Sequence, residues 1–221
     1  MILRTTEMAP VRNFRGATDA EIVSEAARIV QHGGVIAMPT DSVYALGARA
    51  FDEAAVRRVC AIKGQRDGKP ILVLIADRSQ LDALVARIPP AAEVLMDRFW
   101  PGPLTIVFPV APRLPIELTA GTGTIGVRLP VQPLLARLLR AAGPLTGTSA
   151  NRSGIPPAQT AREVQELLGD DVDLIVDGGP ASATRPSTVV EVTGTARVLR
   201  EGPIERATLK AALAQEGIAL A

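Results

Sequence analysis

Four short polar segments of the chain carry the residue types that bind small anionic or zwitterionic molecules. They span residues 39–47, 63–70, 122–130 and 148–154, and Ser187, Thr188 and Arg200 belong with the last of them. Each segment lies at the end of an expected apolar strand, which is where open α/β sheets usually bind ligands. Any one of them is compatible with an ordinary turn, but four in one apolar domain favour a single lined cavity.

The first two segments differ in the ligand that they suit. Residues 39–47, Pro-Thr-Asp-Ser-Val-Tyr-Ala-Leu-Gly, offer hydroxyl groups and a turning backbone to a small zwitterion. A tight turn in which Asp41 bonds its own backbone explains these residues equally well. The second segment brings Lys63, Arg66 and Lys69 together with two glycines, which favours a polyphosphate clamp. The plainer alternative is that Lys63 only complements the C-terminal end of a helix.

The other two segments contain an arginine and a set of small polar side chains. Arg128 lies on an otherwise apolar strand. A buried arginine requires a carboxylate or phosphate partner, because an unpaired buried charge is very costly. That partner is either a ligand or a structural salt bridge. In the last segment, Ser149 and Asn151 bring hydroxyl and amide groups that suit phosphate oxygens and a ribose.

Several familiar motifs are incomplete in this chain. Residues 64–69 have too few residues between the glycines for a phosphate loop, and Pro70 stands where that loop needs Ser or Thr. Residues 121–126 match GxGxxG, but a strand is expected after them instead of a helix. The single histidine, His32, and the single cysteine, Cys60, argue against Ser-His-Asp catalysis and a CxxC metal site. Chemistry is therefore expected from Lys, Arg, hydroxyl, amide and backbone groups.

Composition narrows the class of protein further. The chain has 221 residues, 47% of them hydrophobic, which is enough for one sizeable core. Its 24 Lys and Arg residues nearly balance 23 Asp and Glu residues, so a globally basic nucleic-acid surface is not expected. No apolar run approaches the length of about 18 residues that a membrane span needs. We expect a soluble, cytoplasmic protein without membrane contact, and the single cysteine agrees with a reducing compartment.

Helices and short strands are expected to alternate along the whole chain. Capping boxes at residues 18–21 and 160–163 predict two helix starts, and apolar periodicity predicts helices over 53–63 and 133–142. Two short helices are also expected, near 79–88 and 91–99. Strands are expected over 35–38, 71–76, 104–110, 125–129, 145–148, 174–176, 188–192 and 197–200. This order predicts one α/β domain over residues 1–221, built on a twisted open sheet with mixed parallel and antiparallel strands.

Eight segments, taken together and in order, resemble the YrdC-like family. They are residues 39–47, 63–70, 100–105, 126–130, 149–151, 177–179, 187–190 and 200–202. The resemblance covers a core from about residue 17 to residue 204. It implies a large positively charged cavity in the α/β fold and no additional C-terminal domain.

The best-known members of this family are L-threonylcarbamoyladenylate synthases. The resemblance implies a nucleotidyltransferase that joins L-threonine, bicarbonate and ATP into L-threonylcarbamoyl-AMP and releases pyrophosphate. Other enzymes, the downstream threonylcarbamoyl-transfer machinery, then move the threonylcarbamoyl group to adenosine 37 of tRNA. Binding of RNA or tRNA is a separate implication of the resemblance. Mg²⁺ is expected through the ATP phosphates, with no metal ligand from the protein.

The resemblance also implies roles for individual residues. It assigns catalysis to Lys63 and Arg66. The implied ATP-binding residues are Lys63, Gln65, Lys69, Thr124, Ser149, Asn151 and Arg200. The implied threonine-binding residues are Thr40, Ser42, Arg128, Gly147 and Ser187. Arg128 is the expected partner of the threonine carboxylate, because its guanidinium can bond both carboxylate oxygens.

Several positions depart from the family pattern, and two of them leave alternatives open. The Lys-x-Arg motif of the family reads Lys63-Gly-Gln65 here, with Arg66 one position later, and Leu74 stands where many synthases have histidine. Some segments also resemble the YciO branch of the family. The alternatives are a YciO-like nucleotide- or double-stranded-RNA-binding protein with weak or no synthase activity, and a carbamoyl-adenylating enzyme for another substrate.

Overall fold

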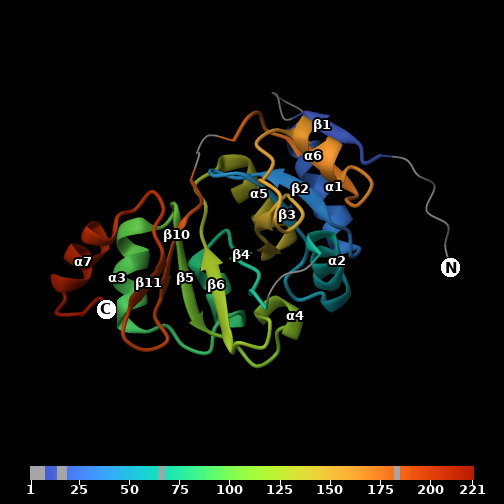
Figure 1. Ribbon diagram of the computed structural model, residues 1–221. Helices are drawn as coiled ribbons and strands as arrows, with labels where there is room; N and C mark the ends of the chain where they lie inside the picture. Colours follow the sequence, from blue (N-terminus) through green and yellow to red (C-terminus); the bar gives the residue numbers. More distant parts are fainter. Residues whose placement is uncertain (1–7, 14–18, 65–67, 182–184) are drawn as a thin grey trace.

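The computed structural model describes residues 8–13, 19–64, 68–181 and 185–221. Within these residues the chain forms an α/β fold, as expected, but its strands belong to two sheets (Figure 1). The first sheet has five strands, in the spatial order β1 (Val11–Asn13), β9 (Leu174–Asp177), β2 (Ile36–Pro39), β3 (Tyr44–Gly47) and β8 (Thr148–Ser149). The second has six, in the order β11 (Arg197–Arg200), β10 (Thr188–Glu191), β5 (Leu104–Pro109), β6 (Thr124–Arg128), β4 (Val73–Leu74) and β7 (Leu145–Thr146).

Both sheets mix parallel and antiparallel pairs. In the five-stranded sheet β9 runs parallel to β1 and β2, whereas β3 is antiparallel to β2 and β8. In the six-stranded sheet β5–β10 and β4–β6 are parallel, and the other pairs are antiparallel. The predicted mixed open architecture is therefore confirmed, and its division into two sheets is an addition that the strand pattern did not indicate.

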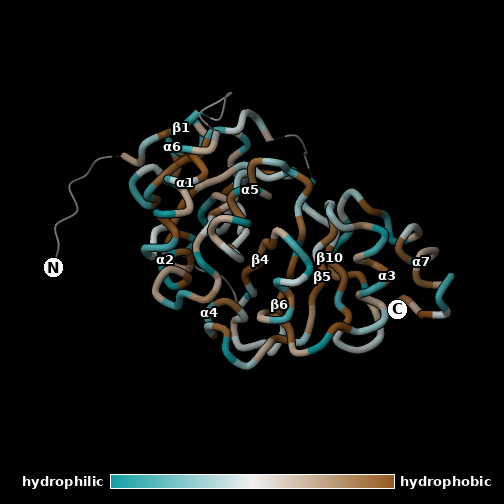
Figure 2. Tube along the Cα trace, turned by 180° about the vertical axis from the view of Figure 1, so that it is seen from behind, coloured by the Kyte–Doolittle hydropathy of each residue, from teal (hydrophilic) through white to brown (hydrophobic). Residues whose placement is uncertain are grey.

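Helices pack against both sheets and bury the hydrophobic core. They are α1 (Asp19–Gln31), α2 (Glu53–Lys63), α3 (Pro90–Phe99), α4 (Ile116–Thr119), α5 (Pro133–Ala142), α6 (Ala161–Leu168) and α7 (Arg206–Ala214), with a 3₁₀ helix at Arg78–Ala83. In Figure 1, α3 and α7 lie beside β5, β10 and β11, while α1, α5 and α6 surround the five-stranded sheet. Figure 2 shows that the hydrophobic segments gather in the interior along β4 and β5. No helix among the residues described is long and apolar enough to cross a lipid bilayer.

Local sequence explains where two of these helices begin. The Thr160 side chain accepts a hydrogen bond from the backbone N–H of Glu163, as the capping box at residues 160–163 predicts. Gln132 caps α5 in the same way through the N–H of Leu135, and Pro133 follows at the first helical position. The other predicted capping box cannot be compared in full, because Thr18 lies outside the described residues.

The two sheets are joined through Thr146, which is fully buried. Its backbone N–H donates to the carbonyl of Ala48 at 2.8 Å. Its hydroxyl donates to the carbonyl of Leu46 and accepts from the N–H of Ala48, both at 2.9 Å. One threonine of the six-stranded sheet thus satisfies polar groups at the end of β3 in the other sheet, because buried backbone groups require partners.

The chain passes from one sheet to the other at Gly147. A single strand was expected over 145–148, but β7 ends at Thr146 and β8 begins at Thr148 in the other sheet. A side chain at residue 147 would place its Cβ 2.6 Å from Cγ of Leu74. Glycine therefore permits this close approach, and the bend of the chain splits the expected strand in two.

A second close approach holds the end of β11 against the start of β10. The Gly202 N–H donates to the Thr188 hydroxyl at 2.9 Å, and that hydroxyl donates to the carbonyl of Ile204 at 2.8 Å. A Cβ at residue 202 would lie 2.5 Å from the Thr188 nitrogen and closer still to the carbonyl oxygen of Pro186. Ser187 and Arg200 are kept next to each other by this packing.

We expect Gly202→Ala to destabilise the protein by about 1–3 kcal/mol, because a methyl group here meets backbone atoms that cannot rotate away. Urea denaturation followed by circular dichroism measures the free energy of unfolding. Gly194→Ala is the matched control, since a Cβ at residue 194 meets no atom within 4 Å. Equal stability of the two variants would contradict the close packing at Gly202.

Candidate active site

A cavity of about 510 Å³ lies where the two sheets meet. The turn after β2, the end of β6, the connection between the sheets and the segment before β10 all reach it. Its lining residues are Thr40, Ser42, Val43, Ala45, Pro70, Leu72, Leu74, Arg128, Gly147, Thr148, Ser149, Pro157, Gln159, Pro186, Ser187 and Arg200. Hydroxyl groups, one amide and two guanidinium groups therefore converge from segments that are far apart in the sequence.

The turn between β2 and β3 is organised by Thr40, which is 7% exposed. Its hydroxyl donates to the carbonyl of Val43 at 2.6 Å and accepts from the N–H groups of Ser42 and Val43. The Asp41 carboxylate points to Arg128 instead of serving as the organiser of this turn. Thr40 and Ser42, on either side of Asp41, line the cavity.

Arg128 is a buried cation at the end of β6, with 2% of its surface exposed. Its Nε donates to the carbonyl of Gly102 at 2.9 Å, and its Nη2 donates to Asp41 Oδ2 at 2.5 Å. Burial lowers the pKa of Arg128, and the Asp41 charge opposes that shift. The sequence left a ligand and a salt bridge as alternative partners; the structure contains the salt bridge and also places Arg128 on the cavity wall.

Arg200 is the second guanidinium group of the cavity and is held by Ser187. Its Nε and Nη2 donate to the Ser187 carbonyl at 3.1 and 2.9 Å. The Ser187 hydroxyl is in turn 2.8 Å from the hydroxyl of Thr105, which is 4% exposed. Burial and the nearby charge of Arg128 both lower the pKa of Arg200. Two cations thus face one cavity, an arrangement that favours anionic ligands.

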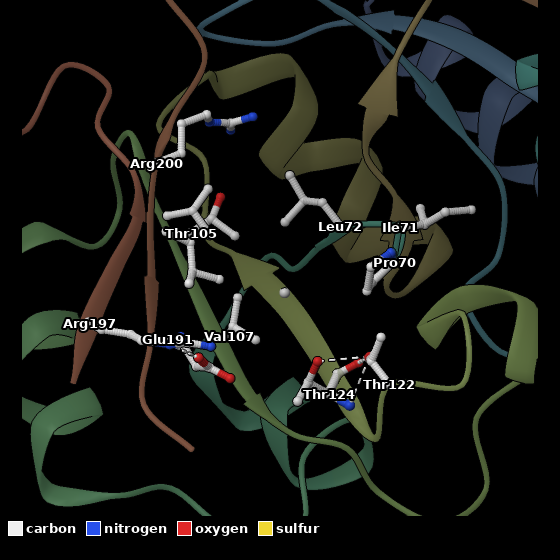
Figure 3. Close-up of a pocket in the computed structure, with 13 residues that line it drawn as sticks. Pro70, Ile71, Leu72, Thr105, Val107, Thr122, Thr124, Glu191, Arg197 and Arg200 are labelled. Carbon is white, nitrogen blue, oxygen red and sulfur yellow. Dashed lines mark hydrogen bonds and ion pairs between the residues drawn. The ribbon is translucent and has the colours of Figure 1, made fainter. Parts of the chain in front are cut away.

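A smaller cavity of about 490 Å³ adjoins the first and shares Pro70, Leu72 and Arg200 with it. Figure 3 shows the Thr122 and Thr124 hydroxyl groups at one end, 2.9 Å apart, and Glu191 with Arg197 along the opposite side. The Arg200 guanidinium group points away from Glu191 and Arg197 (Figure 3). This cavity is mainly apolar along its walls and polar at its ends.

Lys63 lies behind the wall of the main cavity. Its Nζ donates to the carbonyl of Ser149 at 2.8 Å and to Asn151 Oδ1 at 2.5 Å, and Nζ lies 3.3 Å from the Ser149 hydroxyl. A lysine at the end of a helix is usually solvated, but Lys63 is only 7% exposed. Its position at the end of α2 directs the ammonium group under the 149–151 turn, so Ser149 stands between Lys63 and the cavity.

The structure brings most, but not all, of the predicted site residues together. All five residues predicted to bind threonine line the main cavity, as do Ser149 and Arg200 of the nucleotide set. Thr124 lines the adjoining cavity. Lys63 and Asn151 lie behind Ser149, and Lys69 is exposed next to Pro70, which lines both cavities. Gln65 and Arg66 lie outside the described residues.

Two polar residues of the site had no assigned role in the sequence. Asp41 was considered only as a turn residue, although it lies next to two predicted threonine-binding residues and offers a carboxylate to Arg128. Thr105 belongs to the segment at residues 100–105, and the sequence indicated no partner for its hydroxyl group. It is found against Ser187, 82 positions away. No local sequence pattern predicts the Asp41–Arg128 or the Thr105–Ser187 contact, because the two residues of each pair are more than 80 positions apart.

Comparison with known proteins places this α/β fold in one class of proteins. The Sua5/YciO/YrdC family model, described as "Telomere recombination", matches residues 28–202. A protein of Mycobacterium tuberculosis H37Rv named "Putative threonylcarbamoyl-AMP synthase" is 39% identical over 183 residues, covering 82% of this chain and 84% of the relative. The "Threonylcarbamoyl-AMP synthase" of Bacillus subtilis is 38% identical over 200 residues, covering 89% of this chain and 58% of the relative.

Solved structures agree with these sequence matches. "Crystal structure of P. abyssi Sua5 complexed with L-threonine" superposes with a TM-score of 0.90 at 33% identity, over 96% of this chain and 63% of that one. Escherichia coli YciO superposes with a TM-score of 0.80 at 32% identity, over 90% of this chain and 98% of that one. The chain thus spans less than two thirds of the B. subtilis and P. abyssi proteins. It belongs to the Sua5/YciO/YrdC family.

We expect Lys63→Met to reduce the free energy of unfolding by about 1–3 kcal/mol, because it leaves acceptors of Ser149 and Asn151 without their charged donor. Urea denaturation measures the change. Lys210→Met on the exposed face of α7 is the control, with an expected change within about 0.5 kcal/mol. A Lys63→Met variant as stable as the control would contradict the buried role of Lys63.

Proposed function

We propose that this protein makes L-threonylcarbamoyl-AMP from L-threonine, bicarbonate and ATP, with release of pyrophosphate, for the modification of adenosine 37 in tRNA. The observation that carries this proposal is the convergence of all five predicted threonine-binding residues on one cavity. The names of the B. subtilis and M. tuberculosis relatives, and the L-threonine complex of P. abyssi Sua5, support the same activity. The single cysteine of the chain fits the reducing cytoplasm, where ATP and tRNA occur.

Threonine binds in the main cavity with its carboxylate on Arg128. The guanidinium group is fixed at Nε by Gly102 and at Nη2 by Asp41, so its orientation is set before a ligand arrives. A planar guanidinium recognises a carboxylate with paired hydrogen bonds. Ser42 and Ser187, on either side of the cavity, offer hydroxyl groups to the remaining polar atoms of the amino acid.

ATP occupies the remaining part of the main cavity and extends past Arg200. The support for this placement is that Arg200 lines both cavities, while Thr124 lies in the adjoining one. Lys63, through Ser149, adds a positive charge behind the cavity wall. We place the phosphates near Ser149 and Arg200, and the nucleoside toward Thr124. Lys69 and Gln65 belong to the same nucleotide set by sequence, and Arg66 is assigned to catalysis.

The reaction needs positioning and charge more than a proton-transfer side chain. The threonine amine adds to bicarbonate with loss of water, or to CO₂ with loss of a proton from the nitrogen, and forms a carbamate. An oxygen of this carbamate then attacks the α-phosphorus of ATP while pyrophosphate leaves. Negative charge develops on the α-phosphate and on the leaving pyrophosphate. Arg200 and the buried ammonium of Lys63 lower the energy of that charge, because fixed cations in a partly dry site need no reorganisation.

Mg²⁺ enters this site with ATP. The main cavity offers hydroxyl, amide and guanidinium groups, and no group of three His, Cys, Asp or Glu side chains able to hold a metal occurs in the part of the chain that the structure describes. Mg²⁺ usually keeps several waters and binds substrate phosphates. In this proposal Mg²⁺ would be held by phosphate oxygens and water, and it would supply additional positive charge near the leaving pyrophosphate.

The proposal predicts pyrophosphate release that depends on threonine. Purified protein with ATP, Mg²⁺, bicarbonate and L-threonine is expected to form an adenylated threonine carbamate, because the cavity brings amino acid and nucleotide together. A coupled pyrophosphate assay and mass spectrometry of the product mixture measure both products. Omission of threonine is the control. Binding of ATP or double-stranded RNA without turnover would contradict the proposal and favour a YciO-like binding protein.

Arg128→Lys is expected to raise the KM for threonine about 10- to 100-fold. Lysine keeps the positive charge but lacks the planar fork that pairs with a carboxylate, and hydrogen bonds to charged groups contribute about 1.5–3 kcal/mol. The KM for ATP should change less. Arg162→Lys, at an exposed position of α6, is the matched control. An unchanged KM for threonine would remove Arg128 from the site.

A further inference from the structure

The Asp41–Arg128 pair joins the two sheets at the cavity. Asp41 belongs to the turn between β2 and β3, and Arg128 ends β6 of the other sheet. Asp41 Oδ2 lies 2.5 Å from Arg128 Nη2, and the two side chains are 12% and 3% exposed. The pair is therefore nearly dry, so its attraction is much less screened by water than that of a surface ion pair.

Asp41 fixes the direction of the Arg128 side chain. The Gly102 carbonyl holds Nε, Asp41 holds Nη2, and the Ser42 hydroxyl lies 3.5 Å from Nη1. These contacts engage three of the five N–H groups that a guanidinium carries. Two fixed points on a planar group set its orientation, and the other N–H groups are left to meet a ligand.

Asp41 also balances charge where two cations face one cavity. Arg128 and Arg200 are close enough for the charge of Arg128 to lower the pKa of Arg200. Burial disfavours the charged form of Arg128 as well, and the Asp41 carboxylate is the group that opposes this effect. Loss of the carboxylate would leave Arg128 buried with weaker partners and free to rotate away from the cavity.

We propose that Asp41 is a positioning residue for amino-acid binding, which acts through Arg128 by holding its guanidinium group toward the substrate carboxylate. The proposal rests on the proposed function of Arg128 as the carboxylate partner. It assigns to Asp41 a selective effect on threonine, because Asp41 contacts Arg128, whereas ATP is placed toward Arg200 and Thr124.

The test measures the Kd of L-threonine and of Mg-ATP by isothermal titration calorimetry for wild-type protein and three variants. Asp41→Asn is expected to weaken threonine binding at least 10-fold and to change ATP binding less than twofold. Asp41→Glu keeps the carboxylate on a longer arm, so threonine binding is expected to weaken about 3- to 10-fold. Asp97→Asn is the control, since Asp97 also accepts from an arginine at 2.5 Å but is 67% exposed.

The outcomes separate this proposal from the proposed function. Wild-type protein that binds no threonine would overturn both. Threonine binding by a folded Asp41→Asn variant within twofold of wild type would overturn the role of Asp41 alone. Equal weakening of threonine and ATP would also overturn it, because that result indicates a general structural role. If Asp41→Asn does not fold, Asp41→Glu decides: unchanged threonine binding overturns the proposal, and selective weakening supports it.

Discussion

The architecture of this protein depends on a positive charge buried between two sheets. Taking a guanidinium group out of water costs several kcal/mol unless an anion and other acceptors surround it. Arg128 obtains its anion from the turn of the other sheet and its neutral acceptor from Gly102. The two sheets must therefore pack so that Asp41 and Arg128 are within ion-pair distance. Arg128 thereby contributes a positive charge to the wall of the candidate site, where the two sheets meet.

Lys63 repeats this arrangement with a different set of acceptors. Its ammonium group is enclosed by a backbone carbonyl and an amide oxygen of the 149–151 turn. The Ser149 hydroxyl donates to the same Asn151 oxygen at 2.6 Å, and the Asn151 amide donates to the Ile155 carbonyl. The buried Lys63 and these hydrogen bonds thus stabilise the 149–151 turn. Ser149, which lines the cavity, is therefore held in place by Lys63 and Asn151, which do not line it.

The sequence predicted the elements of this fold better than their assembly. The bounds of α2 and α5 were predicted from apolar periodicity and end signals, which act within a few residues. The strand expected over 71–76 is reduced to the two residues of β4, which pair with β6 on one side and β7 on the other. A helix expected near 79–88 is a 3₁₀ helix that ends at Ala83. Pairing partners and sheet boundaries depend on contacts between distant segments, which no local pattern contains.

The candidate site shows the same division. The residue types and their places at strand ends predicted a lined cavity, and Thr40, Ser42, Arg128 and Ser187 do share one. The burial of Lys63 was not predictable, because a lysine at a helix end is usually solvated and only the approach of the 149–151 turn covers it. The sequence likewise could not identify the partner of Arg128, since a carboxylate of the protein and a carboxylate of a ligand would satisfy the guanidinium group equally well.

The ion pair at the sheet junction closes a loop of 87 positions, and the contact of Lys63 with Asn151 closes one of 88. Contacts between residues so far apart in sequence cost loop-closure entropy, and they are typical of slow-folding topologies. The main cavity is complete only when segments from Thr40 to Arg200 have reached their native positions. A ligand that enters it selects the native form over every partly folded one, so saturating concentrations would raise the melting temperature through mass action.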